Sequence, residues 1–594
     1  MEGAVNSTAK PSVMLTKLYF RLLPIQILIA VVGSINGIVS TLFASNYVGA
    51  EAMSAVGLYG PINLFIGAVS TLLFGGSQLL AGEYMGKSQV RHTQNAFTLD
   101  LILSTAFGLV ISLLLVLAGL TNGARLFTKN EAVGGILNQY LLGQAIGVLP
   151  MVLGQQLSAF LSLEHQNKRT TVASIVFIIV NLILNYVFVY LLKMSAFGLS
   201  LASSLGMWVF FLVQFQHYLS GKSSLKISPK GVHWNDTGKI VRIGLPTALN
   251  TGYQAVRGVI VNAVIVKYVG ELGLSAFSAA NTMLGFAWAI PGAMLAVSRM
   301  LMSISVGEED RQSLRDEIKI MFTRCIPLMA VVCAAIILLS GTLAGFYFQD
   351  RSSDVYQMTK AGFMILPLCM PLSIISMHFT CYGQLSGKDI LIHVANAFDG
   401  FISVSFFTWL LTPAIGIKGV YVANVINGIV TLIIFVGYSV LKNKRFPKNT
   451  DDLLVVPAAF GVPENERMDL TVTKLDEVVK VAEEVHQFCL DRGIDEKRAY
   501  LAGLSMEEMA GNIIEHGYTK DKKQHSVDVR VIHKDDEMIL RLKDDCVPFD
   551  PKERSEIVDP EDITKNIGIR MIYRLASDIK YQNILGLNVL MIKV

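Results

Sequence analysis

The residues best suited to chemistry lie near the C-terminal end of this 594-residue sequence. Glu508 and Asn512 are four positions apart within a stretch predicted to be helical, and His516 follows four positions later. Because residues i and i+4 project from the same face of a helix, a carboxylate and an amide stand side by side here. Glu508 is suited to act as a base on a water or hydroxyl group. Asn512 can offer an oxygen to Mg²⁺, which prefers oxygen ligands.

Two further motifs follow in a fixed order. The stretch DDCVPFDP places Asp544 at the end of a predicted strand, with Pro548 and Phe549 directly after it. The stretch NIGIRMI places Gly568 where a helix opens, and the free backbone N–H groups of a helix start can face a phosphate. One such motif arises often by chance, and only the order and spacing of the three together are specific.

The elements that must position these motifs form a compact domain after Lys448. Amphipathic helices are predicted over 474–491 and 496–516, the first with an apolar stripe. The runs SVDVRVIH, MILRLKD and NVLMIKV alternate as antiparallel strands do. We therefore expect an α/β sandwich in which a layer of helices covers a mixed or antiparallel sheet.

The preceding part of the chain has a different composition. Residues 1–445 carry 29 Lys and Arg against 17 Asp and Glu, whereas residues 446–594 carry 21 against 29. With 52% apolar residues and a mean hydropathy of +0.50 overall, the first part is typical of a membrane-embedded region. This composition excludes the classes of ordinary soluble enzymes and of disordered proteins.

Stretches of about 20 apolar residues, enough to cross a bilayer, give twelve predicted membrane spans. They lie near 20–44, 55–80, 95–118, 134–158, 171–192, 197–218, 241–266, 277–300, 319–345, 359–382, 391–411 and 417–440. Of the Lys and Arg residues assigned to connections, 21 fall on one side, with Arg299 among them, and 7 on the other. This bias predicts that both termini are cytoplasmic.

The spans form an internal repeat with an offset of about 221 residues. The segment Tyr47-Val48-Gly49 recurs as Tyr268-Val269-Gly270, and Gly86 matches Gly307. Six spans per repeat give both halves the same direction through the membrane, as in transporters built from parallel repeats.

The segment YVGAEAMSAVGLYGPINLF, the loop 82–87 and the segment RIGLPTALN resemble the multidrug and toxic compound extrusion (MATE) family. The resemblance covers roughly residues 15–442 and implies an all-α membrane protein of twelve transmembrane helices in two six-helix lobes, 1–220 and 221–445. It also implies export of small organic, often cationic, compounds coupled to Na⁺ or H⁺. Many members have an acidic residue where this sequence has Ser40, which puts cation coupling at that position in doubt.

The three C-terminal motifs together resemble the GHKL ATPase superfamily, most closely the serine kinases that act as anti-sigma factors. For residues 446–594 this resemblance implies ATP and Mg²⁺ as cofactors, with Glu508 as the catalytic base and Asn512 as the Mg²⁺ ligand. It further implies that Asp544 binds the adenine amino group and that His516, Pro548, Phe549 and Gly568 help to hold ATP. Cys546 and Asn566 replace glycines that are usual in the family, so a degenerate regulatory domain is an alternative to an active kinase.

Ionisable residues inside predicted spans are candidates for the transport pathway because their burial in a bilayer is costly. Asp399 and Arg257 lie near the middle of their spans, and we hypothesise that they pair across a cavity; a static salt bridge is the alternative. Asp100 lies nearer the cytoplasmic end, where snorkelling to water is expected. Asn36 adds hydrogen-bonding capacity in the first span.

These observations predict a bacterial inner-membrane transporter whose cytoplasmic kinase-like domain regulates transport or signals its state. Its expected partners are the lipid bilayer, a small organic substrate and a small cytoplasmic protein of the anti-sigma-antagonist type, without nucleic acid. The alternatives are a membrane sensor with serine-kinase output and a flippase for lipid-linked substrates. No Walker A loop occurs, so an ATP-binding-cassette pump is disfavoured.

Overall fold

The computed structural model describes most of the chain. It covers residues 12–43, 50–126, 128, 130–221, 223–228, 232–517, 525–534, 536–548, 550–552 and 567–594, with the backbone alone for 32–43, 50–57 and 126. Two compact units result, a helical unit that ends at Val456 and a C-terminal domain over 457–594. Each is described by itself.

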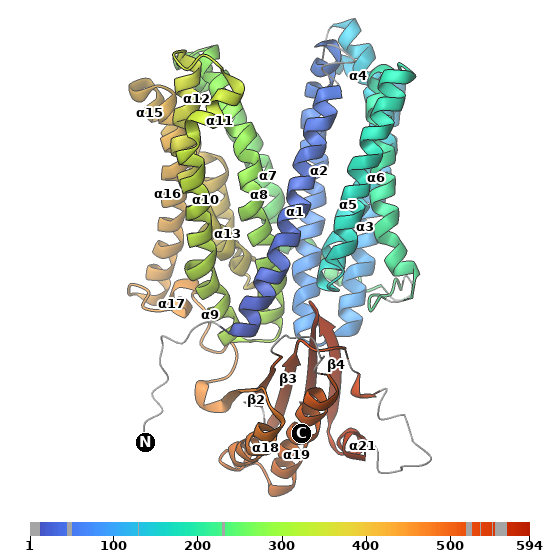
Figure 1. Cartoon of the computed structure of the whole chain (residues 1–594), viewed down its shortest axis with the longest axis vertical. Helices are drawn as coiled ribbons and strands as arrows, with labels where there is room; N and C mark the ends of the chain where they lie inside the picture. The colour runs from blue at the N-terminus through green and yellow to red at the C-terminus, as the bar shows by residue number, and fades with distance from the viewer. Residues whose placement is uncertain are drawn as a thin grey trace. The chain divides into compact units, whose positions relative to one another are not determined.

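The first half of the helical unit, the N-lobe, is built from six long helices (Figure 1). They are α1 (Val13–Phe43), α2 (Ala50–Gly86), α3 (Val90–Leu120), α4 (Glu131–Leu163), α5 (Asn167–Asn185), which continues into the π-helical η3 (Tyr186–Leu191), and α6 (Ser195–Leu219); the short η2 spans Gly123–Leu126.

The second half, the C-lobe, repeats this plan with more interruptions. Its elements are α7 (Asn235–Tyr268), α8 (Glu271–Gly307), α9 (Arg311–Ile320), η4 (Met321–Cys325), α10 (Ile326–Leu338), α11 (Ser340–Tyr347), α12 (Asp354–Ile365), η5 (Leu366–Leu368), α13 (Cys369–Leu385), α14 (Asp389–Ala397), η6 (Phe398–Ile402), α15 (Ser403–Ile415), α16 (Ile417–Asn443) and α17 (Thr450–Leu454).

Within the described residues, 11 helices are long and apolar enough to cross a membrane. They correspond to all the predicted spans except 241–266. That span is α7, which is 34 residues long but has a polar middle with Asn250, Gln254 and Arg257. These side chains line a cavity, so α7 is less apolar than its neighbours because it faces the interior of the lobe.

The lobes contact each other where α2 ends and α7 begins. A side chain on Gly76 or Gly244 would collide with the backbone of the facing helix, at Ile240 and Leu72 respectively. The repeat-related Gly86 and Gly307 also meet here. Small residues let helix backbones approach closely, which is how membrane helices pack without a hydrophobic driving force.

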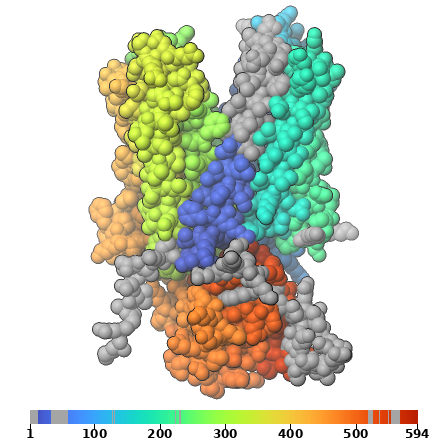
Figure 2. All heavy atoms as spheres, viewed as in Figure 1, coloured from blue at the N-terminus to red at the C-terminus, as the bar shows by residue number. Residues whose placement is uncertain are grey.

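Helix α1 lies in the seam between the lobes, where it contacts α8 on one side and α5 on the other (Figures 1 and 2). The Tyr19 hydroxyl donates a hydrogen bond to the backbone oxygen of Met294 on α8 at 3.2 Å. The first helix of the N-lobe therefore also packs against the C-lobe and is hydrogen-bonded to it.

The helical unit extends past the predicted boundary at 445. Asp451 on α17 forms ion pairs with Arg311 at 3.2 Å and with Arg315 at 2.7 Å, both on α9. The Ser439 hydroxyl on α16 donates to the backbone oxygen of Asp452 at 2.6 Å. Residues 446–456 are charged but pack on the helices, and composition alone could not show this.

Over its described residues, the C-terminal domain is an α/β sandwich of five strands and three main helices (Figure 1). Its elements are η7 (Glu464–Glu466), β1 (Arg467–Val472), α18 (Leu475–Leu490), α19 (Glu496–Asn512), the π-helical η8 (Ile513–Gly517), β2 (Val527–Lys534), β3 (Glu537–Asp544), α21 (Ile567–Leu575), β4 (Asp578–Ile584) and β5 (Leu587–Lys593). The strand order is β1-β2-β3-β5-β4, and every pairing is antiparallel.

The core of this domain follows from alternation on the strands and helical periodicity. Val527, Val529 and Val531 on β2 face inward and pack with the apolar stripe of α18, which includes Val478 and Val485. The two predicted helices and three predicted strands are confirmed. The polar edge strands β1 and β4 were missed, because edge strands with exposed faces carry little apolar alternation.

Candidate functional site

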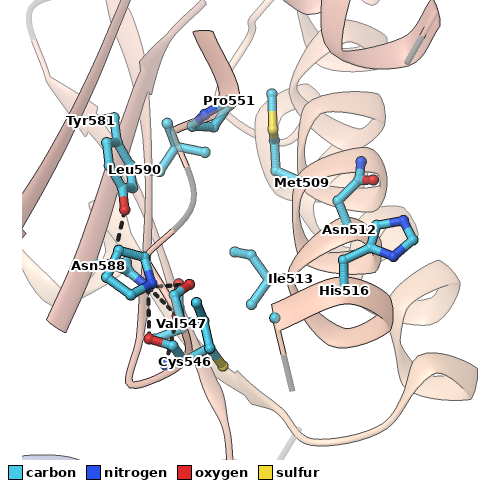
Figure 3. Close-up of a pocket in the computed structure, with 13 residues that line it drawn as sticks. Met509, Asn512, Ile513, His516, Cys546, Val547, Pro551, Tyr581, Asn588 and Leu590 are labelled. Carbon is cyan, nitrogen blue, oxygen red and sulfur yellow. Dashed lines mark hydrogen bonds between the residues drawn. The ribbon is translucent and has the colours of Figure 1, made fainter. Parts of the chain in front are cut away.

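The C-terminal domain contains a pocket between α19–η8 and the strands β3, β5 and β4 (Figure 3). Met509 and Ile513 point from the helix toward the sheet, and Leu590 and Tyr581 lie on the sheet side. The cavity measures about 120 Å³. Its apolar walls are suited to a flat aromatic ring, and its polar groups lie at defined points on its edge.

Asp544, at the end of β3, is the buried acidic group of this pocket, with a residue exposure of 3%. Its Oδ1 accepts hydrogen bonds from the Cys546 backbone N–H at 2.9 Å and from the Asn588 amide at 2.8 Å. Burial raises the pKa of Asp544 above its ordinary value, and these donors oppose that shift. The carboxylate is therefore held in one orientation by neutral groups.

Asn588 on β5 is a site residue that the sequence analysis missed. It is the register partner of Asp544, and its Oδ1 accepts hydrogen bonds from Tyr581 and Asn583, each at 2.9 Å. In the sequence, Asn588 is only a polar residue at the start of the apolar run NVLMIKV. Its role becomes visible once the strand pairing places it opposite Asp544.

Asn512 and His516 line the pocket from the helix side. The Asn512 amide donates to the backbone oxygen of Glu508 at 2.6 Å, which leaves its Oδ1 available as a metal ligand. The chain changes from α-helix to π-helix directly after Asn512, and π-helical turns are frequent at functional sites. An amide oxygen on the pocket wall fits the expected Mg²⁺ ligand.

Glu508 lies outside the pocket lining but against Gly568, at the start of α21. A side chain on Gly568 would collide with the Glu508 carboxylate. Burial raises the pKa of Glu508, and the neighbouring charge of Glu507 adds to the increase. The predicted base and the predicted phosphate-binding glycine are thus brought together, and only glycine leaves room for this contact.

The remaining predicted ATP ligands are divided between the pocket and the undescribed part of the chain. Pro548 lines the pocket. Phe549 lies outside the described residues, and so does Asn566, which stands where the family usually has a glycine. The described lining fits the adenine end of a nucleotide, since a buried acidic group, apolar walls and an amide oxygen border one pocket.

Cys546, which replaces the usual glycine, is 7% exposed and lines the pocket. Its Cβ lies 3.2 Å from the point where a Cβ on Gly517 would stand. The thiol therefore takes up space between β3 and the end of η8.

A Cys546→Gly protein is expected to bind ATP about three- to tenfold more tightly, because the pocket gains the volume of the thiol while the backbone N–H that binds Asp544 is kept. Equilibrium binding of a fluorescent ATP analogue to the full chain measures this. Cys546→Ser, which keeps nearly the same volume, should change the affinity little. Equal or weaker binding by Cys546→Gly would contradict the role given to the thiol.

A second set of ligand types lies beside this pocket. His525, Asp545 and Cys546 place their ligand atoms within 4.8 Å of one another, and His525 Nδ1 is 2.9 Å from Asp545 Oδ1. Nitrogen and sulfur suit softer ions than Mg²⁺, so this set is distinct from the expected Mg²⁺ ligand Asn512.

In the helical unit, a cavity of about 740 Å³ is lined by the C-lobe and by Leu64 on α2 of the N-lobe. Arg257 on α7, Arg299 on α8 and Asp399 on η6 are its charged lining residues, all within the described chain. Asn250, Asn281 and other amide and hydroxyl groups, together with aromatic side chains, complete the lining. It is a polar cavity inside a helical bundle.

Arg257 and Asp399 share this cavity, as hypothesised, but no ion pair joins them in the described structure. The Asp399 carboxylate instead accepts hydrogen bonds from Asn427 at 2.9 Å and from Thr431 at 3.4 Å, both on α16. The π-helical turn η6 packs against both α7 and α16, and the hydrogen-bond donors of the Asp399 carboxylate come from α16. The Asp399 carboxylate is therefore hydrogen-bonded to neutral donors rather than to Arg257, its predicted partner.

Arg299 was assigned by the charge count to a connection between spans, and that assignment is wrong. It lies within α8, and its guanidinium lines the cavity. Its Nε is buried and has no hydrogen-bond partner among the described residues. Sequence position near a helix end did not show which way this side chain points.

The N-lobe has a smaller cavity of about 400 Å³, lined by amides such as Gln26, Gln78 and Gln155 and by aromatic rings. All of the described residues that line it are uncharged. The polar groups form short contacts between helices, for example Ser70 Oγ to Gln155 Oε1 at 2.5 Å.

Asp100 on α3 does not snorkel to water, which corrects the expectation from sequence. Its exposure is 0%, and its Oδ1 accepts a hydrogen bond from Ser77 on α2 at 2.7 Å. Its Oδ2 is buried without a hydrogen-bond partner among the described residues. Asn36 belongs to α1, but its side chain lies outside the described part of the structure.

The fold and the two kinds of site define a multi-pass helical membrane protein joined to a domain with a nucleotide-type pocket. Residues 25–187 match the family model MatE, and residues 471–593 match the model of the histidine kinase-like ATPase domain. The chain thus contains a MatE segment in its helical unit and a histidine kinase-like ATPase segment in its C-terminal domain. Search of curated proteins gave no match.

Solved structures of MATE proteins share the fold of the membrane unit. A MATE protein in complex with MaL6 is 21% identical, with a TM-score of 0.64 over 72% of this chain and 97% of that chain. An outward-facing multidrug resistance MATE family transporter is 20% identical, with a TM-score of 0.66 over 72% and 96%. A MOP superfamily transporter from Pyrococcus furiosus is 21% identical, with a TM-score of 0.63 over 72% and 97%; the reversed polarity of its binding pocket is said to suggest a different function.

Proposed function

We propose that this protein exports small organic compounds across the bacterial inner membrane by ion-coupled antiport, and that ATP binding to its cytoplasmic domain regulates transport or signals its state. The observation that carries this proposal is the polar cavity of about 740 Å³ inside the C-lobe of a MATE-fold unit. Intramembrane cavities with ionisable residues mark substrate and ion pathways.

The N-lobe supplies a candidate for the coupling-ion site. Asp100 is fully buried, and one of its carboxylate oxygens has no partner among the described residues. A buried carboxylate has a high free energy when ionised unless a cation or a proton neutralises it. Many MATE proteins have an acidic residue at the position of Ser40. Binding and release of H⁺ or Na⁺ at Asp100 would take over the function of that acidic residue.

The C-terminal domain is proposed to hold ATP with the adenine ring against Asp544 and Mg²⁺ on Asn512. When bound, ATP would supply the phosphoryl group, and Mg²⁺ would offset the negative charge of the phosphates. Glu508 would accept the proton of a Ser or Thr hydroxyl on a small cytoplasmic partner protein. The N-terminus of α21 at Gly568 would stabilise negative charge beside it.

Loss of the metal ligand gives a direct test of the nucleotide site. An Asn512→Ala protein is expected to bind ATP about 10- to 100-fold more weakly in the presence of Mg²⁺. In EDTA the two proteins should bind ATP equally, because the amide then has no metal to hold. Isothermal titration of the full chain under both conditions measures this, and an equal loss in EDTA would assign Asn512 a structural role instead.

Export is tested by flux through proteoliposomes that contain the full chain, with an imposed Na⁺ or H⁺ gradient and with or without ATP. Two fluorescent probes of opposite charge, 2-naphthalenesulfonate and 2-naphthyltrimethylammonium, serve as cargo. Gradient-dependent flux of either probe is expected. Ligand-dependent phosphorylation without flux of either probe would favour the membrane sensor.

A further inference from the structure

The charges that line the C-lobe cavity do not balance within the described structure. Two guanidinium groups, Arg257 and Arg299, face one carboxylate, Asp399. Among the described residues, neither arginine forms a hydrogen bond or an ion pair, and Arg299 Nε is buried without a partner. Both arginines are half-buried, and a guanidinium shielded from bulk water is costly unless an anion compensates it.

In the described structure, Asp399 forms no ion pair with either arginine, although its charge acts on Arg257 through space. Asp399 accepts its hydrogen bonds from Asn427 and Thr431, which are neutral. Even if Asp399 offsets the charge of one arginine through space, the other remains uncompensated. Among the described residues no second carboxylate lines the cavity, so its described lining carries a net positive charge that a bound anion can neutralise.

The rest of the lining indicates what else that molecule contains. Phe277 and Trp288 on α8 line the same cavity as the arginines. Aromatic walls favour an apolar or aromatic body, and the planar fork of an arginine matches a carboxylate, sulfonate or phosphate. An organic cation would meet two like charges here.

We propose that the C-lobe cavity is a binding site for an amphipathic organic anion, whose acidic group contacts Arg257 and Arg299 and whose apolar body lies against the aromatic wall. This inference rests on the proposed export function and names its substrate class. It replaces the cationic cargo that the family resemblance suggested with an anionic one.

The test compares two probes that share a naphthalene body and differ in charge. 2-Naphthalenesulfonate is expected to bind the detergent-solubilised full chain about tenfold or more tightly than 2-naphthyltrimethylammonium, by isothermal titration with micelle blanks subtracted. Arg299→Gln and Arg257→Gln should each weaken sulfonate binding about tenfold or more, and Arg299→Lys should restore part of it. Asp399→Asn should tighten it, because a competing negative charge is removed.

Lys267→Gln is the matched control, since Lys267 lies on α7, carries the same charge and is exposed at the helix end rather than in the cavity. Its sulfonate affinity should equal that of the unmodified chain. Equal or tighter binding of the cation, or unchanged sulfonate binding in both arginine-to-glutamine proteins, would overturn the proposal. Gel-filtration profiles equal to that of the unmodified chain show that the variants are folded.

Competition distinguishes two sources of the anion. Displacement of the sulfonate by dihexanoyl phosphatidic acid in preference to 2-naphthoate assigns a lipid headgroup, and the reverse preference assigns a free organic anion; both support an anion site. Binding in detergent does not require transport. Anion binding without vesicle flux would therefore overturn export alone, whereas flux and tight binding of the cation would overturn the anion site alone.

Discussion

A Glu508→Gln protein is expected to bind Mg²⁺-ATP about as tightly as the unmodified chain but to transfer phosphate about 10²- to 10⁴-fold more slowly. The size of the effect is that of removing a general base from a proton-transfer step. Glutamine has the same shape and can fill the same space against Gly568, so the helix start of α21 need not move. Phosphate transfer to the partner protein, followed with labelled ATP, measures the rate, and equilibrium titration measures the binding.

The pH dependence of this reaction gives an independent check. Burial raises the pKa of Glu508, and the charge of Glu507 adds to the increase. Glu508 is a base only when it is ionised, so the rate should reach its plateau above this raised pKa and fall as the pH drops through it. The fall should therefore begin at a higher pH than for an unperturbed glutamate, whose pKa is about 4.3.

Glu507→Gln is the matched control, because it removes a neighbouring exposed carboxylate and leaves the base in place. It should keep most of the rate and move the acid limb of the profile to lower pH, since one cause of the raised pKa is gone. A Glu508→Gln protein that retains the full transfer rate would exclude Glu508 as the base. A profile unaffected by Glu507→Gln would assign the titration to another group.

An Asp100→Asn protein is expected to lose gradient-driven efflux, to roughly a tenth or less of the unmodified rate. Asparagine retains an oxygen that can accept the Ser77 hydrogen bond but can neither take up a proton nor neutralise a cation. The buried Oδ2 without a partner among the described residues is the position at which the ion would be held. Flux of the naphthalene probes through proteoliposomes under Na⁺ and H⁺ gradients measures the loss and identifies the ion.

Ser104→Ala is the control for this experiment. Ser104 is also fully buried on α3, and its hydroxyl likewise lacks a partner among the described residues. Its removal should leave efflux nearly unchanged, because a hydroxyl carries no charge to couple to the gradient. If Asp100→Asn retains full efflux, Asp100 has no part in coupling and is only a buried structural carboxylate.

Most of the elements follow from local sequence patterns. Runs of apolar residues predicted the long helices, alternation predicted β2, β3 and β5, and the spacing of Glu508, Asn512 and His516 predicted one helical face. These signals act between residues that are near in the chain, where periodicity and steric preference decide the outcome. The repeat offset could be found in the same way, because duplicated segments keep their spacing.

The partners of the site residues were decided by the tertiary structure. Strand register placed Asn588 beside Asp544, and the packing of α2 on α3 buried Asp100 against Ser77. The side chains of Arg257 on α7 and Arg299 on α8 line the same cavity and make it positively charged. From its sequence position, Arg299 is predicted to lie in a connection between spans. Sequence determines which residues can carry charge or form a helix; the free energy of burying a charge depends on neighbours that come from distant segments, and only the packed structure supplies them.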